Sequence, residues 1–572
     1  MTATAIRSPV ERSGTEQHRP RRRYRPASVP GLVWAAALFI SSITPSLVPR
    51  SWYAQALTSG LCTAYGYGFG VVVGWLSGRL CGLLQLKITV SGSARRWLRR
   101  CGYAVLVIGT AGVWSMSWAW QRQTALLVGL APAAPWQHLV SPIASVVLAI
   151  ALVMAVRGLR ALARRWARVG RRYVRPIIAT PIAAVLVAGM VWIVSDSVVY
   201  RGFMEYTARE AAGINAAAPV GRTAPTSSLR SGGPGSAESW TSLGRNGQAF
   251  VADGSTPAAI AAATGRPATE PIRVYAGLSG GRSLDQVAEA VVAELRRTGA
   301  FDREVLAVMT TTGRGWVDEW SASSIEYLTA GNSAIAAMQY SYLPSYVALL
   351  ADRSTPAAAG RLLFAKVRAE WSRRPPGHRP KLVVGGESLG AYGGQAAFAD
   401  VQDMLSTVDG AVWVGTPNFT PLWSGLTDHR QGGSPEVAPV IDSGTHIRFV
   451  TGPADLTQDI YGRSYASWRT PRIVYAQHAS DPITWWSTDL LTEEPDWLRE
   501  RVGDDVNDTR WAFFATFWQL TTDLTVANST PPGHGHRYAE ELVPAWAAVL
   551  GLDPSADFGT IEAAIRRDYR SV

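Results

Sequence analysis

A serine lies between glycines in the stretch GGESLGAYGG, which covers residues 385–394 and follows the apolar residues Leu-Val-Val. The pattern G-x-S-x-G is typical of a nucleophile elbow, in which a strand leads directly into the serine and a helix leaves directly after it. The bare pattern is weak, and the chain contains a second match around Ser279. Ser388 has an apolar run before it and a run of small helix-compatible residues after it, whereas Gly280 and Gly281 separate Ser279 from the next helix. We therefore predict that Ser388 is a nucleophile.

A serine hydroxyl becomes a good nucleophile only when a histidine accepts its proton and a carboxylate orients that histidine. In folds with this elbow, the carboxylate and then the histidine follow the serine along the chain. His534 and His536 lie in a Gly/Pro loop just before a helix, and we favour His536 because it is next to that helix, with His534 as the alternative. As a metal site the pair lacks nearby acidic or cysteine ligands, so we predict neither a metal nor a cofactor.

The carboxylate is predicted to be Asp481, which follows the apolar run 472–477 after a short loop. Asp455 is the rival, with His478 as its histidine after the next strand. That alternative agrees better with the order of the strands, because no obvious strand comes just before His536. Both pairings stay open from the sequence.

The negative charge that develops on a reacting carbonyl oxygen needs hydrogen-bond donors. The backbone amide of Leu389, the residue after the nucleophile, is one predicted donor. The loop at Ser279, which follows a strand expected two before the elbow strand, is predicted to supply the other. The loop 312–316 after the next strand is an alternative.

The elements that must position these residues lie in the second half of the chain, where short apolar runs alternate with helical patterns. Such alternation predicts a mostly parallel sheet covered by helices on both faces. The expected strands cover residues 272–278, 305–313, 381–388, 409–416, 446–452 and 472–477. Helical segments are expected from about residue 314 to 371, and the apolar run 511–527 is expected to be a core helix or a lid rather than a membrane span.

The first 200 residues differ from the rest in charge and in hydropathy. They carry 23 Lys/Arg and 3 acidic residues, a balance of +20, while the remainder has a balance of −8, which together give the net charge of +12. Five apolar runs in this part are each about as long as the roughly 20 residues that cross a bilayer. They cover about 31–49, 61–84, 101–120, 138–156 and 176–200. This pattern predicts a transmembrane helical domain over residues 30–200 with about five spans.

Basic residues gather in the tail of residues 1–29 and in alternate loops, between the second and third runs and between the fourth and fifth. By the positive-inside rule these segments are cytoplasmic, and five crossings then place everything after Tyr200 outside the cell membrane. Residues 201–265, rich in Ala, Gly, Ser and Pro, are expected to be a connector, and residues 266–572 the catalytic domain. Because apolar runs flank the basic loops, we predict membrane lipids rather than nucleic acid as the partner.

Eight segments spread along nearly the whole chain carry a more specific resemblance. They are TPSLVPR (44–50), SGGPGS (231–236), PIRVYAGL (271–278), TGRGWV (312–317), QYSYLPS (339–345), GESLGAYG (386–393), HASDPITWW (478–486) and PPGHGHRY (531–538). In these segments the chain resembles the actinobacterial membrane-bound α/β-hydrolase family, in which a multi-span N-terminal domain precedes the hydrolase domain. The resemblance implies an N-terminal transmembrane helical bundle, a C-terminal α/β-hydrolase domain and serine hydrolase activity, and it names no substrate.

The combined prediction is a membrane-anchored serine hydrolase with an acyl-enzyme on Ser388 and an active site outside the membrane. Its substrate is expected to be an ester such as a lipid, because of the location and the aromatic segments around 485–486 and 511–518. Two alternatives remain. One is an acyltransferase that passes the acyl group to an envelope acceptor, and the other is a non-catalytic membrane scaffold or transport accessory that retains the hydrolase fold.

Overall fold

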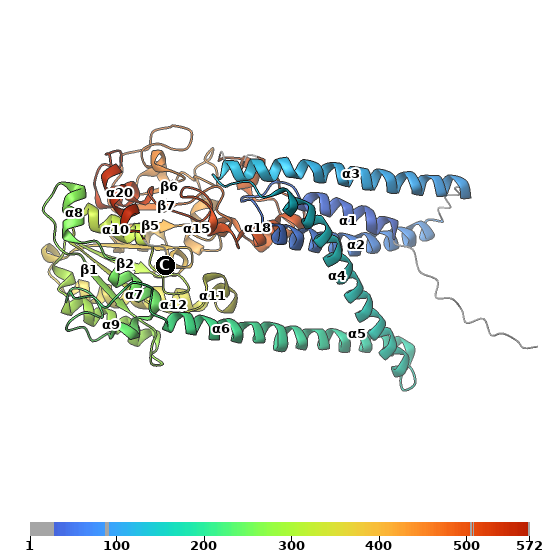
Figure 1. Ribbon diagram of the computed structural model, residues 1–572, viewed down its shortest axis with the longest axis horizontal. Coiled ribbons are helices and arrows are strands. Elements are labelled where there is room, and N and C mark those ends of the chain that lie inside the picture. The colour runs from blue at the N-terminus through green and yellow to red at the C-terminus, as the bar shows by residue number, and fades with distance from the viewer. Residues whose placement is uncertain (1–27, 86–90, 504–505, 507, 570–572) are drawn as a thin grey trace, which may run out of the picture.

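The second half of the chain is built around one parallel sheet (Figure 1). The computed structural model describes residues 28–85, 91–503, 506 and 508–569, and within them seven strands form this sheet in the order β1-β3-β2-β4-β5-β7-β6. Every neighbouring pair is parallel. The strands are β1 (Ile272–Ala276), β2 (Val305–Thr310), β3 (Ser333–Met338), β4 (Lys381–Glu387), β5 (Gly410–Val414), β6 (Ile447–Val450) and β7 (Arg472–Ala476).

Both faces of the sheet are covered, so the strands are mostly apolar, although β1 contains the buried Arg273 and β6 the buried Arg448. In β4, Leu382 and Val384 point into one apolar cluster and Val383 points into the other, as the two-residue period of a strand requires. Helices α9 (Leu284–Arg297), α12 (Ser354–Ser372), α13 (Leu389–Gln395), α14 (Val401–Thr407) and α15 (Pro421–Asp428) join the first cluster. Helices α7 (Gly244–Ala252), α8 (Pro257–Thr264), α10 (Glu319–Leu328), α19 (Leu542–Leu550) and α20 (Gly559–Asp568) join the second. The predicted parallel sheet with helices on both faces is confirmed.

Shorter elements connect these layers. Four further helices are α11 (Ser345–Ala351), α16 (Pro482–Trp485), α17 (Asp496–Glu500) and α18 (Ala515–Asp523). Short 3₁₀ turns are η2 (Trp240–Leu243), η3 (Ala300–Asp302), η4 (Pro376–His378), η5 (Asp442–Gly444), η6 (Pro453–Leu456), η7 (Thr488–Leu491) and η8 (Ala527–Ser529). The run 511–527 therefore contains a nine-residue helix, which is too short to cross a bilayer.

Strand β3 lies in the segment that the sequence predicts to be helical, and that prediction is wrong for these six residues. Ser-Ala-Ile-Ala-Ala-Met is rich in alanine, the best helix former, but the segment is fully buried between β1 and β2. Pairing with two strands overrides the helical propensity of its residues. One consequence is that β1 becomes the edge strand and β2, rather than β1, leads into the loop beside β4.

The described residues between 29 and 216 form long helices and their connections. The helices are α1 (Val29–Ser42), α2 (Trp52–Leu83), α3 (Gly92–Leu127), α4 (Pro135–Gly170), α5 (Pro176–Ile193), a π-helical segment η1 (Val194–Tyr200) and α6 (Arg201–Ala216). Among the described residues, four helices are long and apolar enough to cross a membrane: α2, α3, α4 and the continuous helix Pro176–Ala216. We refer to residues 29–216 as the helical region and to the chain from β1 onward as the sheet domain.

Two expected boundaries in the helical region differ from the structure. The predicted span 31–49 gives only the 14-residue helix α1, because Pro45 and Pro49 follow its end and cannot continue a helix. The structure thus has four candidate spans and one shorter apolar helix where about five spans were expected. The predicted connector 201–265 begins with sixteen helical residues, since α6 continues the last apolar helix. Of the predicted basic tail, residues 1–27 lie outside the described residues.

Glycines allow α1 and α2 to pack closely. Gly66 and Gly70, one turn apart on α2, face the backbone of α1, and a Cβ atom at Gly70 would overlap the carbonyl of Pro30. Small residues four apart are a common device for close packing of helices in lipid. Helix α2 packs in turn against α4, and α4 against α5.

The sheet domain lies at one end of the helical region, where the α1–α2 loop, the α3–α4 loop and the end of α6 emerge (Figure 1). Arg50 of the first loop reaches Asp523, and Gly129 of the second lies against Pro531. One arginine-rich segment lies around the end of α2 and the start of α3. The other lies around the end of α4 and the start of α5. In Figure 1 these ends lie away from the sheet domain.

Candidate active site

Ser388 sits on a sharp turn between β4 and α13. Its backbone angles are φ 55° and ψ −122°, a conformation that costs a non-glycine residue about 1–3 kcal/mol. The turn is held because the Ser388 amide donates to the Val414 carbonyl of β5 at 2.9 Å. Gly390 lies directly against the Thr310 carbonyl of β2, where any Cβ atom would overlap it. The strand, strained turn and thin helix have the geometry of a nucleophile elbow.

Asp481 and His536 meet at the carboxyl end of the sheet. His536 Nδ1 lies 2.6 Å from Asp481 Oδ2. The same carboxylate accepts hydrogen bonds from the Ile483 amide at 2.8 Å, from the Thr484 hydroxyl at 3.1 Å and from the Tyr538 hydroxyl at 2.9 Å. Burial would raise the pKa of Asp481, but the adjacent His536 and these donors hold it below its usual range. The aspartate is therefore ionised and fixed in orientation.

The loop that carries His536 is held by contacts from separate segments instead of by a preceding strand. The His536 backbone amide donates to the Ala527 carbonyl at 3.0 Å, and the Gly535 amide donates to Ser480 Oγ at 3.0 Å. His478 Nδ1 lies 2.9 Å from the Gly535 carbonyl, and its ring stacks on Tyr538 with centroids 4.1 Å apart. These contacts hold the loop against the segment that contains Asp481.

The second ring nitrogen of His536 faces the elbow. His536 Nε2 is buried, has no hydrogen-bond partner among the described residues, and lies 3.5 Å from Glu387 Oε1, on the residue just before Ser388. Ser388 and His536 line the same cavity. The structure thus places Ser388, His536 and Asp481 at one site, with Nε2 of His536 on the side of the elbow.

Three other predicted residues occupy different positions. Asp455, at the end of edge strand β6, accepts hydrogen bonds from the Thr451 amide at 2.8 Å and the Thr451 hydroxyl at 2.7 Å. His478 Nε2 lies 3.0 Å from Glu541 Oε1, so the pairing of Asp455 with His478 is not seen. The His534 carbonyl accepts a hydrogen bond from the Thr530 hydroxyl at 2.6 Å, and the residue does not line the cavity that contains Ser388.

The candidate oxyanion donors come from α13 and from the loop after β2. Leu389 and Thr312 both line the cavity, whereas Ser279, which follows edge strand β1, does not. The Thr312 amide already donates to the Trp316 carbonyl at 3.0 Å, so the Thr312 hydroxyl is a candidate donor from this loop. The geometry favours the loop 312–316 over Ser279, because the insertion of β3 moves β1 away from β4.

Comparison with known families agrees with this geometry. The alpha/beta-hydrolase family model matches residues 272–559, and the model of the N-terminus of an alpha/beta-hydrolase family matches residues 43–255. The chain belongs to the alpha/beta-hydrolase family. No curated protein matches it. Among solved structures, Trichoderma reesei cutinase in complex with a C11Y4 phosphonate inhibitor aligns at 15% identity over 42% of this chain and 88% of that chain, with a TM-score of 0.19, which supports no further conclusion.

The cavity of this alpha/beta-hydrolase has a volume of about 870 Å³, within the range of roughly 300–1,000 Å³ for small-molecule sites. It is formed between the sheet domain and α6, which contributes Ala211, Ile214 and Asn215. Its aromatic lining consists of Trp316, Trp320, Tyr342, Phe419, Trp486, Tyr538 and Tyr569. Of the expected aromatic segments 485–486 and 511–518, Trp486 alone is in the lining of this cavity. Phe514 stacks on Tyr65 of α2, and Phe517 packs against Trp486.

Two buried carboxyl groups beside the elbow, Glu387 and Asp318, were not predicted from the sequence. Burial, followed by the negative charges of Asp318, Asp481 and Glu541, raises the pKa of Glu387 well above its usual range. Burial also raises the pKa of Asp318, which caps α10, to about 6. The only signal for Glu387 is its place inside G-E-S-L-G at the end of an apolar strand. Both groups line the cavity, where the raised pKa of Glu387 favours its neutral form.

Gly415 is a further site residue without a clear sequence signal. It follows β5 with φ 52°, and a Cβ atom there would overlap the His536 imidazole and lie 3.0 Å from Asp481 Oδ2. Only a glycine leaves room for the ring at this place. Within the described residues no group of three or more His, Cys, Asp or Glu side chains is arranged to hold a metal ion.

Proposed function

We propose that this protein is a membrane-anchored serine hydrolase that cleaves an ester through an acyl-enzyme on Ser388. The Ser388 hydroxyl attacks the ester carbonyl while His536 Nε2 takes its proton. His536 then gives that proton to the leaving alcohol, and Ser388 keeps the acyl group as an ester. A water molecule, deprotonated by the same nitrogen, releases the acid and restores the serine.

One observation carries the proposal. His536 Nδ1 is paired with the ionised Asp481 at 2.6 Å, and its other nitrogen, which has no hydrogen-bond partner among the described residues, faces the cavity that His536 shares with Ser388. The carboxylate fixes the tautomer with a proton on Nδ1, so that Nε2 acts as the base. A serine at a strained elbow beside such a nitrogen is suited to acyl transfer.

The developing oxyanion is assigned to the Leu389 amide and the Thr312 hydroxyl. Leu389 is the first residue of α13, and the amides of the first turn have no partner within the helix. The Thr312 hydroxyl comes from the loop beside the elbow. Loss of a single donor of this kind lowers the rate on the order of 10²–10³-fold in other acyl-transfer enzymes.

The proposed location is the outer face of the cell membrane. The sheet domain lies at the end of the helical region opposite to the arginine-rich segments, which the positive-inside rule assigns to the cytoplasm. The proposed substrate is a lipid or another acyl ester, because the cavity has an aromatic lining and one wall belongs to α6, the continuation of a candidate span. Membrane lipids would then be both the surroundings and a source of substrate.

The test is labelling of the full-length protein in detergent with a fluorophosphonate probe. Wild type is expected to be labelled, and Ser388→Ala, Asp481→Ala and His536→Ala are expected to lose labelling. His534→Ala is the matched control and is expected to retain it. Absence of labelling in folded wild-type protein would overturn the proposal, and a label that survives His536→Ala but not His534→Ala would move the base by two residues.

Hydrolysis of p-nitrophenyl esters with increasing acyl length tests the substrate class. A lipid substrate predicts faster hydrolysis of the longer chains, and equal rates at all lengths would contradict it. Product analysis with an added sugar or lipid acceptor distinguishes hydrolysis, which yields the free acid, from transfer, which yields the acylated acceptor.

A further inference from the structure

The loop between α1 and α2 is buried against the sheet domain. This loop, residues 43–51, contains the TPSLVPR segment. Leu47 is fully buried and belongs to the same apolar cluster as β4 and α12. Ser46 and Arg50 are also buried, with 2% and 5% exposure. Polar side chains at such depth need partners, and both Ser46 and Arg50 contact a residue of α18.

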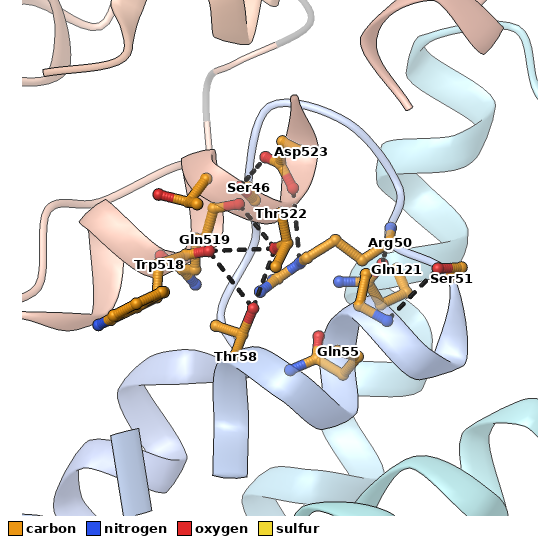
Figure 2. A network of polar contacts seen from close by, with 12 residues as sticks. Ser46, Arg50, Ser51, Gln55, Thr58, Gln121, Trp518, Gln519, Thr522 and Asp523 are labelled. Carbon is orange, nitrogen blue, oxygen red and sulfur yellow. Dashed lines mark hydrogen bonds and ion pairs between the residues drawn. The ribbon is translucent and has the colours of Figure 1, made fainter. Parts of the chain in front are cut away.

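Arg50 and Ser46 converge on one carboxylate, that of Asp523 at the end of α18 (Figure 2). The Ser46 hydroxyl donates to Asp523 Oδ2, and Arg50 Nε lies 3.9 Å from Asp523 Oδ1 with both side chains fully buried. The other guanidinium nitrogens of Arg50 donate to the Ser42 carbonyl at 3.0 Å and the Thr44 carbonyl at 2.8 Å. One arginine therefore joins the end of α1 to the end of α18.

The rest of α18 strengthens this junction. The Gln519 amide donates to the Thr44 carbonyl at 3.2 Å, and the hydroxyls of Thr522 and Thr58 lie 2.9 Å apart (Figure 2). At its other end, Phe514 stacks on Tyr65 of α2 with ring centroids 3.8 Å apart. Along its length, α18 is thus bound to the helical region by polar and aromatic contacts.

The same helix leads directly into the active site. The Val526 amide donates to the Asp523 carbonyl at 3.0 Å, and the next residue, Ala527, accepts the hydrogen bond from the His536 amide. Leu524, directly after Asp523, lines the cavity. Thr521 on α18 accepts a hydrogen bond at 2.9 Å from Trp486, a cavity residue close to Asp481 in the chain. Movement of α18 would displace both sides of the Asp481–His536 pair.

We infer that Arg50 and Ser46 of the α1–α2 loop are positioning residues for His536, acting through Asp523, so that the helical region completes the active site of the sheet domain. The inference rests on the proposed serine hydrolase function. It gives the TPSLVPR segment a role besides joining two helices. It also predicts that the chemical step, rather than probe binding, depends on this junction.

The test uses the full-length protein in detergent and the fluorophosphonate probe. The dependence of labelling rate on probe concentration separates the binding constant KI from the rate constant kinact for the bond to Ser388. Arg50→Met is expected to lower kinact by about tenfold to 10²-fold, since a misplacement of about 1 Å at the base has an effect of this order. KI is expected to stay unchanged, because Arg50 does not line the cavity.

Two further variants sharpen the assignment. Ser46→Ala removes the hydroxyl that donates to Asp523. Because this hydrogen bond acts on His536 only through α18, kinact is expected to fall by about threefold to tenfold, which is less than the full contribution of a hydrogen bond to a charged group. Arg50→Met combined with Asp523→Asn is expected to be no slower than the slower single variant, because the two residues act as one unit. Ser46→Ala decides the question if Arg50→Met does not fold.

The matched control is Arg222→Met, which removes a comparable, mostly buried ion pair with Asp253 that lies outside the junction. This variant is expected to lower the melting temperature and the labelled fraction without changing kinact. A merely structural role for Arg50 gives the same pattern as the control, and that result would overturn the inference while leaving the proposed function intact. No labelling of wild type would instead remove the proposed function.

Hydrogen exchange gives a readout independent of chemistry. In Arg50→Met, the backbone amides of residues 524–537 are expected to exchange faster than in wild type, while those of β4 and α13 keep their protection. Equal protection of residues 524–537 in both proteins would also overturn the inference.

Discussion

Ser388 sits on a strand, turn and helix that are adjacent in the sequence, whereas His536 lies on a loop supported by several distant segments. The elbow needs β4, α13 and one close approach of Gly390 to β2. The histidine loop needs the segment 478–481, η8 and, through α18, the helical region. The difference teaches that the turn at Ser388 depends on neighbouring residues of the chain, while the position of His536 depends on the assembled tertiary structure. Substitutions in the two regions should therefore have different kinds of effect on Ser388 and on His536.

The largest expected effect comes from Asp481→Asn, which leaves the elbow unchanged and alters only the histidine. The amide cannot fix the tautomer with a proton on Nδ1, and kcat is expected to fall about 10⁴-fold, as loss of this carboxylate does in other triads. Ester hydrolysis and the rate of fluorophosphonate labelling measure it. Asp455→Asn is the control, and equal losses in the two variants would contradict the assignment of Asp481.

Gly415→Ala tests the space behind the imidazole. The new Cβ atom would overlap the ring of His536, so kinact is expected to fall on the order of 10²-fold as the base is displaced by about 1 Å. Gly425→Ala, in an exposed part of α15 with no atom near its Cβ position, serves as the control. Unchanged kinact in Gly415→Ala would show that the ring does not need its present position.

Tyr538→Phe removes one of the donors to Asp481 and leaves the others in place. Hydrogen bonds to a charged group contribute about 1.5–3 kcal/mol, so a loss of about 10- to 150-fold in kcat is expected if the whole contribution acts on the base. Tyr475→Phe loses a buried hydrogen bond to Gln395 at 3.0 Å outside the triad and provides the comparison. If both variants are less stable than wild type but keep its kcat, Tyr538 supports the fold and does not act on His536.

The smallest effect on rate is expected for Glu387→Gln, because the raised pKa of Glu387 favours its neutral form, which glutamine resembles in shape. Its raised pKa means that the folded protein keeps a proton that the unfolded chain releases above about pH 4.3, so wild-type stability falls as pH rises from there toward the pKa of the folded state. The Glu387→Gln variant lacks this dependence of stability on pH. The melting temperature of the variant relative to wild type is thus expected to increase between pH 5 and pH 8.

The control for that pH dependence is Glu289→Gln, which replaces an exposed glutamate that pairs with Lys366 on the surface. The difference in melting temperature between this variant and wild type is expected to stay constant over the same pH range. A pH-independent difference for Glu387→Gln would contradict the raised pKa.

The sequence determined those parts of the protein that depend on neighbouring residues. The apolar run before Ser388 and the small residues after it predict the elbow, because strand, turn and helix are all local preferences. The alternation of buried runs and helical patterns predicts the parallel sheet, and the arginine-rich loops between apolar runs predict the helical region. In each case the signal and the structure come from the same stretch of chain.

Only the tertiary structure decided which distant residues meet. His534 and His536 share one loop, and the choice between them follows from the contact of His536 with Asp481. The oxyanion loop depends on β3, whose alanine-rich residues favour a helix until β1 and β2 pair with them. The role of Arg50 depends on Asp523, more than 400 positions later in the chain. Contacts between distant segments are set by how the layers pack, and residue preferences within a short stretch carry no information about them.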